Sequence, residues 1–391
     1  MQGKLVDQPL PEFSLFGGPL HRLGCRMGLV RDGTNTVRLG VALALSVWPV
    51  LIVLALVQGV GEKIFSLGVI GGHVRFLVAV PLLFICETGV FPRMSEFVRE
   101  IVKSGMVPKA ELPELASLIR RVVRLNDSWI SEALFFLVVF ALPLIGPVAE
   151  VAAKMGNWGN FSEQGEGRLY GVGWYHGICL PLFRFLLMRW LWRLGLWWYF
   201  LWRVAKFPLR LVATHPDRAG GLGFLELVQD HFAPLTVAIG AVYSASFAEA
   251  ISTGTMPFEA LGRLVPIVLG MVALLFVCPL FLFSSKLWLC RVNGWSDYMA
   301  MASRYVDAFD RRWVLDETAT GESQLGTADL QSLADLGNSM NVVQGMRLIP
   351  TSRRLVLGTV GFVLLPMLPL LLLKYPIDQL AAKLLQTLTG F

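Results

Sequence analysis

The chain has 391 residues, of which 55% are hydrophobic and only 16% charged, and its mean hydropathy is +0.60. These values are too apolar for a soluble globular domain and predict an all-α, polytopic membrane protein in contact with the lipid bilayer. The formal net charge of +6 is explained by membrane orientation and by contact with anionic lipid headgroups, so it indicates no nucleic-acid partner.

Residues 1–38 are predicted to form a cytoplasmic N-terminal segment. They contain no apolar core that ends in a small-residue cleavage site, so no cleaved signal peptide is predicted. A hydrocarbon core of about 30 Å needs about 20 apolar residues per helix. Stretches of this length predict a membrane region over 39–285, with six spans, and a last span followed by a tail within 355–391. The seven predicted spans cover roughly 39–60, 71–91, 129–149, 178–197, 233–254, 264–285 and 355–375.

The distribution of Lys and Arg between the spans predicts the orientation. If the N-terminus is cytoplasmic, the inner segments hold 5, 7, 4 and 8 of these residues, or 24 of the 34. The outer segments hold 7, with Arg75 at the start of the second predicted span counted among them, and the other three lie within the fourth span. The sequence therefore predicts a cytoplasmic N-terminus and a C-terminus on the opposite side.

Two inner segments are long enough to form a small helical cytoplasmic layer. Residues 92–128 predict two amphipathic helices broken at Gly105–Pro108, and residues 286–354 predict two more, the second N-capped by Thr327. Arginines flank the apolar stripe of the second helix in 92–128, which fits either contact with an anionic leaflet or packing against the other cytoplasmic segment, 286–354. That stripe comprises Leu115, Leu118, Ile119, Val122 and Leu125. An aromatic stripe in the later segment, predicted to be a packing surface, comprises Tyr298, Ala302, Tyr305, Phe309 and Trp313.

The loop before the fifth span carries THPDRAGGLGFL, residues 214–225. His-Pro-Asp is also the signature of the chaperone J-domain, but the segment between the flanking spans is too short for the helical hairpin of that domain. Its glycines permit positive φ and would turn backbone amides toward an anion. Alternatively, a side chain of the loop holds these amides in a tight turn. The candidate loop residues are His215, Asp217, Arg218, Gly220, Gly221 and Gly223.

This loop, together with DLQSLADLGNS at 329–339, resembles a family of uncharacterised bacterial multi-pass inner-membrane proteins. The resemblance implies a bacterial inner (cytoplasmic) membrane, and with the orientation above a periplasmic C-terminus. It implies no activity.

Six ionisable residues lie inside predicted spans, where they are costly and therefore candidates for function. They are Glu87, Glu132, Arg184, Arg189, Arg193 and Glu249. Depth along the helices places Arg184 level with Glu249, and the other two glutamates near Arg193. Arg189 is then the deepest of the arginines and has no obvious partner.

These charges have two interpretations. Three arginines and three glutamates balance to zero and would lock the helices together. Alternatively, Arg189 lies on the same helical face as Arg193 and helps to line a wet cavity that attracts an anion or a lipid headgroup.

The sequence leaves three functional hypotheses. The leading one is a channel- or transporter-like protein for an anionic or amphiphilic solute. The second is a non-catalytic scaffold or signalling subunit that acts through its cytoplasmic helices. The third, an intramembrane lipid-processing enzyme, lacks a motif, since the sequence contains no H-x-x-x-H pair and no G-x-S-x-G. No catalytic residue, metal site or cofactor is predicted, and a homo-oligomer stays open.

Overall fold

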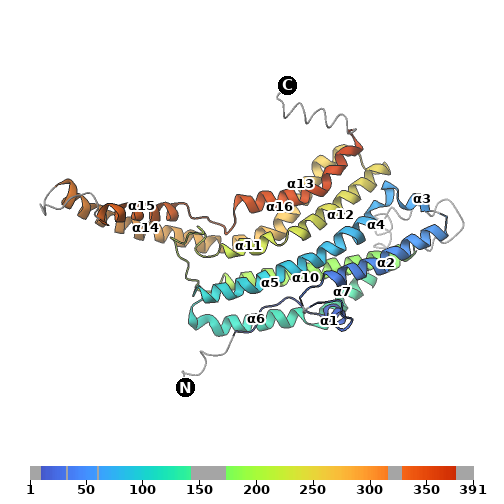
Figure 1. The fold of residues 1–391 in the computed structure, drawn as a ribbon, viewed down its shortest axis with the longest axis horizontal. Helices are drawn as coiled ribbons and strands as arrows, with labels where there is room; N and C mark the ends of the chain where they lie inside the picture. Colours follow the sequence, from blue (N-terminus) through green and yellow to red (C-terminus); the bar gives the residue numbers. More distant parts are fainter. Residues whose placement is uncertain (1–9, 32–33, 60, 142–172, 316–327, 376–391) are drawn as a thin grey trace, which may run out of the picture.

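The computed structural model describes residues 10–31, 34–59, 61–141, 173–315 and 328–375. Every regular element in these residues is a helix. Most helices lie side by side in an elongated bundle, and a pair of helices, α14 and α15, protrudes from one end of it (Figure 1). We call this the hairpin end of the bundle.

The helices have the following bounds. The first half of the chain forms α1 (Pro19–Arg26), α2 (Val37–Val57), α3 (Gly61–Ile64), α4 (Ile70–Val74), α5 (Val80–Lys103), α6 (Leu112–Asn126) and α7 (Trp129–Ala141). The second half forms α10 (Leu180–Val204), α11 (Phe224–Asp230), α12 (Ala233–Ser252), α13 (Leu261–Phe276), α14 (Ser284–Phe309), α15 (Ala328–Gln344) and α16 (Arg353–Leu364). Shorter 3₁₀ or π-helical elements are η1 (Leu67–Val69), η2 (Arg75–Ala79), η3 (Lys109–Glu111), η6 (Tyr175–Cys179), η7 (Phe258–Ala260), η8 (Cys278–Phe283), η9 (Asp310–Val314) and η10 (Leu365–Leu373).

Five described stretches are long and apolar enough to cross a membrane, and they fit an all-α integral membrane protein with several spans. They are Val37–Val57, Leu67–Lys103, Phe224–Ser252, Phe258–Phe276 and Arg353–Leu373. The third predicted span begins as α7, but 142–149 lie outside the described residues. The fourth lies in α10, which is not among the five because its three arginines lower its hydropathy.

Helix α5 is the central element of the bundle. It contacts α2, α11 and α12, and buried side chains follow its length from Val80 to Ile101. The second predicted span and the first predicted amphipathic helix therefore form one continuous helix. The chain then turns at Gly105, whose φ of 69° suits glycine.

Helix α6 packs its apolar stripe against protein. It contacts α10, and Leu115, Ile119 and Val122 are completely buried. Of the two interpretations of this stripe, packing against protein describes these three residues, and the main partner is α10 rather than the predicted one, residues 286–354. Periodicity alone could not separate them, because both require the same amphipathic pattern.

In the hairpin, two residues of the predicted aromatic packing surface contact α15. The Tyr305 hydroxyl donates to the carbonyl of Asp329 at 3.0 Å, and Trp313, in η9, donates its indole N–H to the Asp329 carboxylate at 3.0 Å. The proposed N-cap Thr327 lies outside the described residues.

Helix α12 packs closely on α16 through a glycine. A Cβ atom built on Gly240 would lie 2.4 Å from the carbonyl oxygen of Val363. Small residues let membrane helices approach each other in this way. Backbone, unlike the tip of a flexible side chain, cannot move aside without displacing the helix.

We therefore expect Gly240→Ala to lower the stability of the folded protein by about 1–3 kcal/mol, the usual cost of overpacking. Thermal unfolding in detergent measures this change. Gly270→Ala in α13 is the matched control, because an added Cβ there meets nothing within 4 Å. Equal unfolding temperatures for the two variants would contradict close packing of α12 on α16.

Candidate functional site

Four of the predicted residues meet in one place, which we call the buried charge cluster: Glu87 of α5, Glu132 of α7, and Arg189 and Arg193 of α10. A guanidinium nitrogen of Arg189 lies 3.2 Å from Oε1 of Glu87, and its Nε lies 3.3 Å from Oε1 of Glu132. Arg193 donates to the same Oε1 of Glu87. One carboxylate oxygen is thus shared by two guanidinium groups.

The N-terminal segment completes this cluster. The carbonyl oxygen of Gly17 accepts from Arg189 and from Arg193, each at 3.4 Å. The next residue, Gly18, has φ of 88°, and a Cβ there would lie 2.2 Å from Glu132 Oε1. Only glycine lets the backbone pass so close to the carboxylate.

Further hydrogen bonds hold this segment against the bundle. Ser95 of α5 donates to the carbonyl of Phe13, and Asn126 of α6 donates to that of Leu15 at 3.0 Å. Phe13 and Leu15 are themselves buried. The segment predicted simply to lie outside the membrane is therefore part of the packed core.

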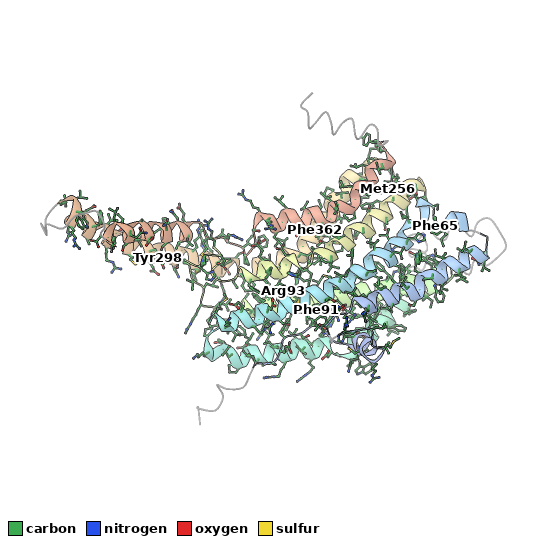
Figure 2. All side chains as sticks on the ribbon, viewed as in Figure 1. Phe65, Phe91, Arg93, Met256, Tyr298 and Phe362 are labelled. Carbon is green, nitrogen blue, oxygen red and sulfur yellow. The ribbon has the colours of Figure 1, made fainter. Side chains whose placement is uncertain are left out.

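The buried charge cluster is closed and electrically balanced. Arg189 is 3% exposed, Arg193 2% and Glu87 1%, and the two arginines face two glutamates. Arg193 also lies over the Phe91 ring, 4.9 Å from its centroid, and Figure 2 labels Phe91 within the bundle. The prediction that Arg189 has no partner and lines a wet cavity is wrong, because two carboxylates and a carbonyl surround it.

The other two predicted charges, Arg184 and Glu249, lie elsewhere. Glu249 of α12 accepts from the backbone N–H of Gly71 at 2.6 Å. Among the described residues, no ion pair joins Glu249 to Arg184. Their equal depth in the predicted spans therefore did not predict a contact between them. The cation that interacts electrostatically with Glu249 is instead Arg75. Arg75 also donates a hydrogen bond to the hydroxyl of Tyr175.

Two π-helical turns build this second cluster. Arg75 begins η2, and Tyr175 begins η6, directly before α10. The charges of Arg184 and Arg75 both act on His176, the second residue of η6. Wide π turns occur often at functional sites, since they displace side chains from regular helical register. We call Arg75, Tyr175, His176, Arg184 and Glu249 the π-turn cluster.

The π-turn cluster differs from the buried charge cluster in charge and exposure. It contains two arginines and one glutamate, no ion pair joins these three among the described residues, and Arg184 is only half-buried. Exposed apolar side chains lie on the same two turns, namely Leu77, Val78 and Ile178, which are 44%, 38% and 39% exposed. Excess positive charge therefore lies beside a surface suited to acyl chains.

The candidate loop residues form a tight turn that is separate from both clusters. The Asp217 carboxylate accepts from the backbone N–H groups of Ala219 at 2.8 Å, Gly223 at 2.7 Å and Gly221 at 3.1 Å. His215 Nδ1 lies 2.7 Å from the same carboxylate. The amides that would have cradled an external anion therefore face Asp217, as the tight-turn interpretation predicted.

The loop also joins separate parts of the chain. The carbonyl of Arg218, a non-glycine residue with φ of 55°, accepts from the N–H of Arg347 at 2.7 Å. Arg347 in turn pairs with Glu226 of α11 at 2.9 Å. Gly220 and Gly221 have φ of 65° and 98°. The turn thus fixes the segment before α16 to the start of α11.

No family model, curated protein or solved structure matches the chain. Its function is therefore argued from the geometry of the two clusters and the loop. Within the described part of the chain, no group of three His, Cys, Asp or Glu side chains is placed to hold a metal ion.

Sequence reasoning missed three participants: the carbonyl of Gly17, Arg75 and Tyr175. The Gly17-Gly18 pair after buried Phe13 and Leu15 is a signal that could have indicated a close backbone approach. Arg75 was counted with the loop before its span. No sequence signal marks a π turn.

We expect Arg189→Leu to destabilise the protein by about 3–5 kcal/mol, because it leaves Glu132 buried without a cation. The double variant Arg189→Leu with Glu132→Leu removes both charges and should recover most of this loss. Unfolding of both variants in detergent measures the coupling. A single variant as stable as the parent chain would show that the cluster does not hold the helices.

The loop predicts a pH effect. Burial raises the pKa of Asp217, but hydrogen bonds from Ala219, Gly223 and Gly221, together with His215, outweigh it and hold the pKa below its usual value of 3.8. A carboxyl group whose pKa is lowered in the folded state stabilises the fold above the unfolded pKa, and this stabilisation is lost as pH falls through the folded value.

Asp217→Asn should therefore be clearly less stable than the parent at neutral pH, and the difference should shrink below about pH 4. Urea unfolding at several pH values tests this. His215→Ala is the control and should cost much less, since its side chain is exposed and the three amides keep their acceptor. A cost of Asp217→Asn that does not change with pH would contradict the assignment.

Proposed function

We propose that the chain is a seven-span protein of a bacterial inner membrane, with a cytoplasmic N-terminus, a periplasmic C-terminus and a cytoplasmic hairpin end. The five apolar stretches, the two further helices α7 and α10, and the distribution of Lys and Arg support this topology. In this topology the buried charge cluster lies toward the cytoplasm, and the π-turn cluster lies in the periplasmic half of the membrane.

We further propose that the protein binds the anionic headgroup of an amphiphile at the π-turn cluster and acts as a channel- or transporter-like protein for such a solute. The observation that carries this proposal is Arg184, a half-buried cation without a described carboxylate partner, whose charge interacts with that of Arg75. An arginine inside a membrane helix is costly when it has no partner. A bound anion offsets this cost.

The chemistry of the cluster favours a phosphate or carboxylate headgroup. Arginine presents a planar fork of N–H donors that bonds two oxygens at once. Tyr175 accepts from Arg75 and thereby fixes that guanidinium beside the site. The exposed side chains of Leu77, Val78 and Ile178 give an acyl chain an apolar surface directly beside the cations.

The two clusters together favour access from the bilayer over an aqueous pore. Arg189 and Arg193 are occupied by glutamates and by the Gly17 carbonyl, which closes the interior at that depth. A solute with an apolar tail reaches Arg184 laterally through the lipid. The proposal is therefore narrower than a general anion channel.

A second candidate function is a scaffold or signalling subunit. It is favoured by the α14–α15 pair, which extends well beyond the bundle (Figure 1) and exposes large apolar side chains such as Trp288 and Leu289. Amphiphile binding does not require such a projection.

Lipid binding to the detergent-purified protein tests the first candidate. Native mass spectrometry with phosphatidylglycerol and with zwitterionic phosphatidylethanolamine should show preferential binding of the anionic lipid. Arg184→Leu should weaken that preference about tenfold or more, the loss expected for a charge-assisted hydrogen bond of 1.5–3 kcal/mol. Arg263→Leu, an exposed arginine at the start of α13, should leave it unchanged.

Competition separates an amphiphile from a free anion. Inorganic phosphate at millimolar concentration should not displace the lipid if the acyl chain contributes to binding. Equal binding of the two lipids by the parent protein, or equal effects of the two arginine variants, would contradict the proposal.

A further inference from the structure

The protruding hairpin carries a regular apolar stripe that the fold itself does not use. On α14, Trp288, Val292, Trp295, Met299 and Val306 follow each other at intervals of four, three, four and seven residues. They are 55%, 45%, 38%, 40% and 40% exposed. We call these five residues the exposed stripe.

The exposed stripe is distinct from the face of α14 that packs on α15. That neighbouring face includes Gly294, which lies beside Val343 of α15, and Tyr305, which bonds to Asp329 of α15. Figure 2 labels Tyr298 on the hairpin, and side chains project from it beyond the bundle. Removing the exposed stripe would therefore leave the α14–α15 contact in place.

The spacing matches the seam of a coiled coil, with the small residue Ala302 at the one skipped position. Apolar residues that alternate at three and four positions stay on one side of a helix and interlock with an identical helix. Charged residues are kept away from this seam, because Asp297 and Arg304 lie on the opposite side of α14. A solvated face would carry charges where these large apolar side chains stand.

A lipid surface fits the exposed stripe less well than a second helix does. A helix that rests on an anionic leaflet has basic residues on its polar face. The described charges of the hairpin balance, with five positive and five negative residues, so no electrostatic attraction favours a leaflet. They are Lys286, Arg291, Arg304, Arg311 and Arg312 against Asp297, Asp307, Asp310, Asp329 and Asp335.

Insertion into a common membrane favours a second copy of this chain as the partner of the exposed stripe. All copies inserted with one topology point their hairpins in the same direction, so a two-fold axis along the membrane normal brings two exposed stripes together in parallel and in register. A seam of fewer than three heptads is marginal between free helices. Confinement to one membrane raises the effective concentration of the two stripes and favours their association.

We propose that the exposed stripe is the interface of a parallel homodimer, in which α14 of one copy packs against α14 of the other around Trp295. This assembly is independent of amphiphile binding at the π-turn cluster.

Disulfide crosslinking in native membranes tests the geometry. The background variant replaces the three cysteines that are not buried, Cys25, Cys278 and Cys290, by serine. In that background, Val292→Cys should form a disulfide-linked dimer on mild oxidation, since the two Cα atoms approach within about 7 Å. Asp297→Cys, on the opposite side of the helix, should not.

Two methionines of equal exposure provide a matched pair for the assembly itself. Met299 lies in the exposed stripe and is 40% exposed, whereas Met301 lies on the other side of α14 and is 41% exposed. Met299→Glu should convert the detergent-solubilised particle from two copies to one, as measured by mass photometry, and Met301→Glu should leave two copies.

Equal crosslinking at Val292→Cys and Asp297→Cys would indicate random collision and overturn the proposal. A monomeric parent protein in which a spin label at position 292 collides with lipid-soluble oxygen would also overturn it, since the stripe would then rest on the bilayer.

Discussion

The structure depends on one shared carboxylate oxygen. Oε1 of Glu87 accepts from both Arg189 and Arg193, at a depth where a lone arginine or glutamate would be costly. The cluster joins α5, α7 and α10, and the Gly17 carbonyl adds the N-terminal segment. These elements are far apart in sequence, so the ion pairs fix their register along the bundle, a role for which non-directional apolar contacts are less suited.

The ratio of arginines to glutamates also differs between the two clusters and indicates different roles for them. In the buried charge cluster every cation has a carboxylate and a backbone acceptor, which leaves no positive charge for a ligand. The π-turn cluster has two arginines and one glutamate, and Arg184 is half-buried beside exposed apolar residues. A protein that only needed to hold its helices together would gain nothing from this second cation. The imbalance is the reason to look for an anionic amphiphile there.

The sequence predicted much of the fold, because helices of this length and apolarity have few alternatives. It also predicted that Glu87, Glu132 and Arg193 lie near one another, since depth along a membrane helix follows from residue spacing. It failed for Arg189, because the helical face that this residue shares with Arg193 fits a shared carboxylate as well as it fits a wet cavity. Positions 189 and 193 are one turn apart and reach the same carboxylate.

Other features could not be derived from residue spacing. The pairing of Arg75 with Tyr175 depends on two π turns, and the contact of Gly17 depends on a non-helical segment that returns to the bundle from outside the spans. The stripe of α6 illustrates a further limit, since its amphipathic pattern fits a lipid surface and a protein surface equally well. In each case the missing information is tertiary: which distant element occupies the neighbouring face.

The contacts of Gly17 and of the two glutamates imply that the buried charge cluster is dry and is closed by the N-terminal segment. A high-resolution map of the protein in lipid nanodiscs tests this arrangement. We expect density for the Gly17 carbonyl against both guanidinium groups, and no chain of ordered waters past Arg189. A continuous column of water that reaches Arg189, with the N-terminal segment displaced from the cluster, would contradict it.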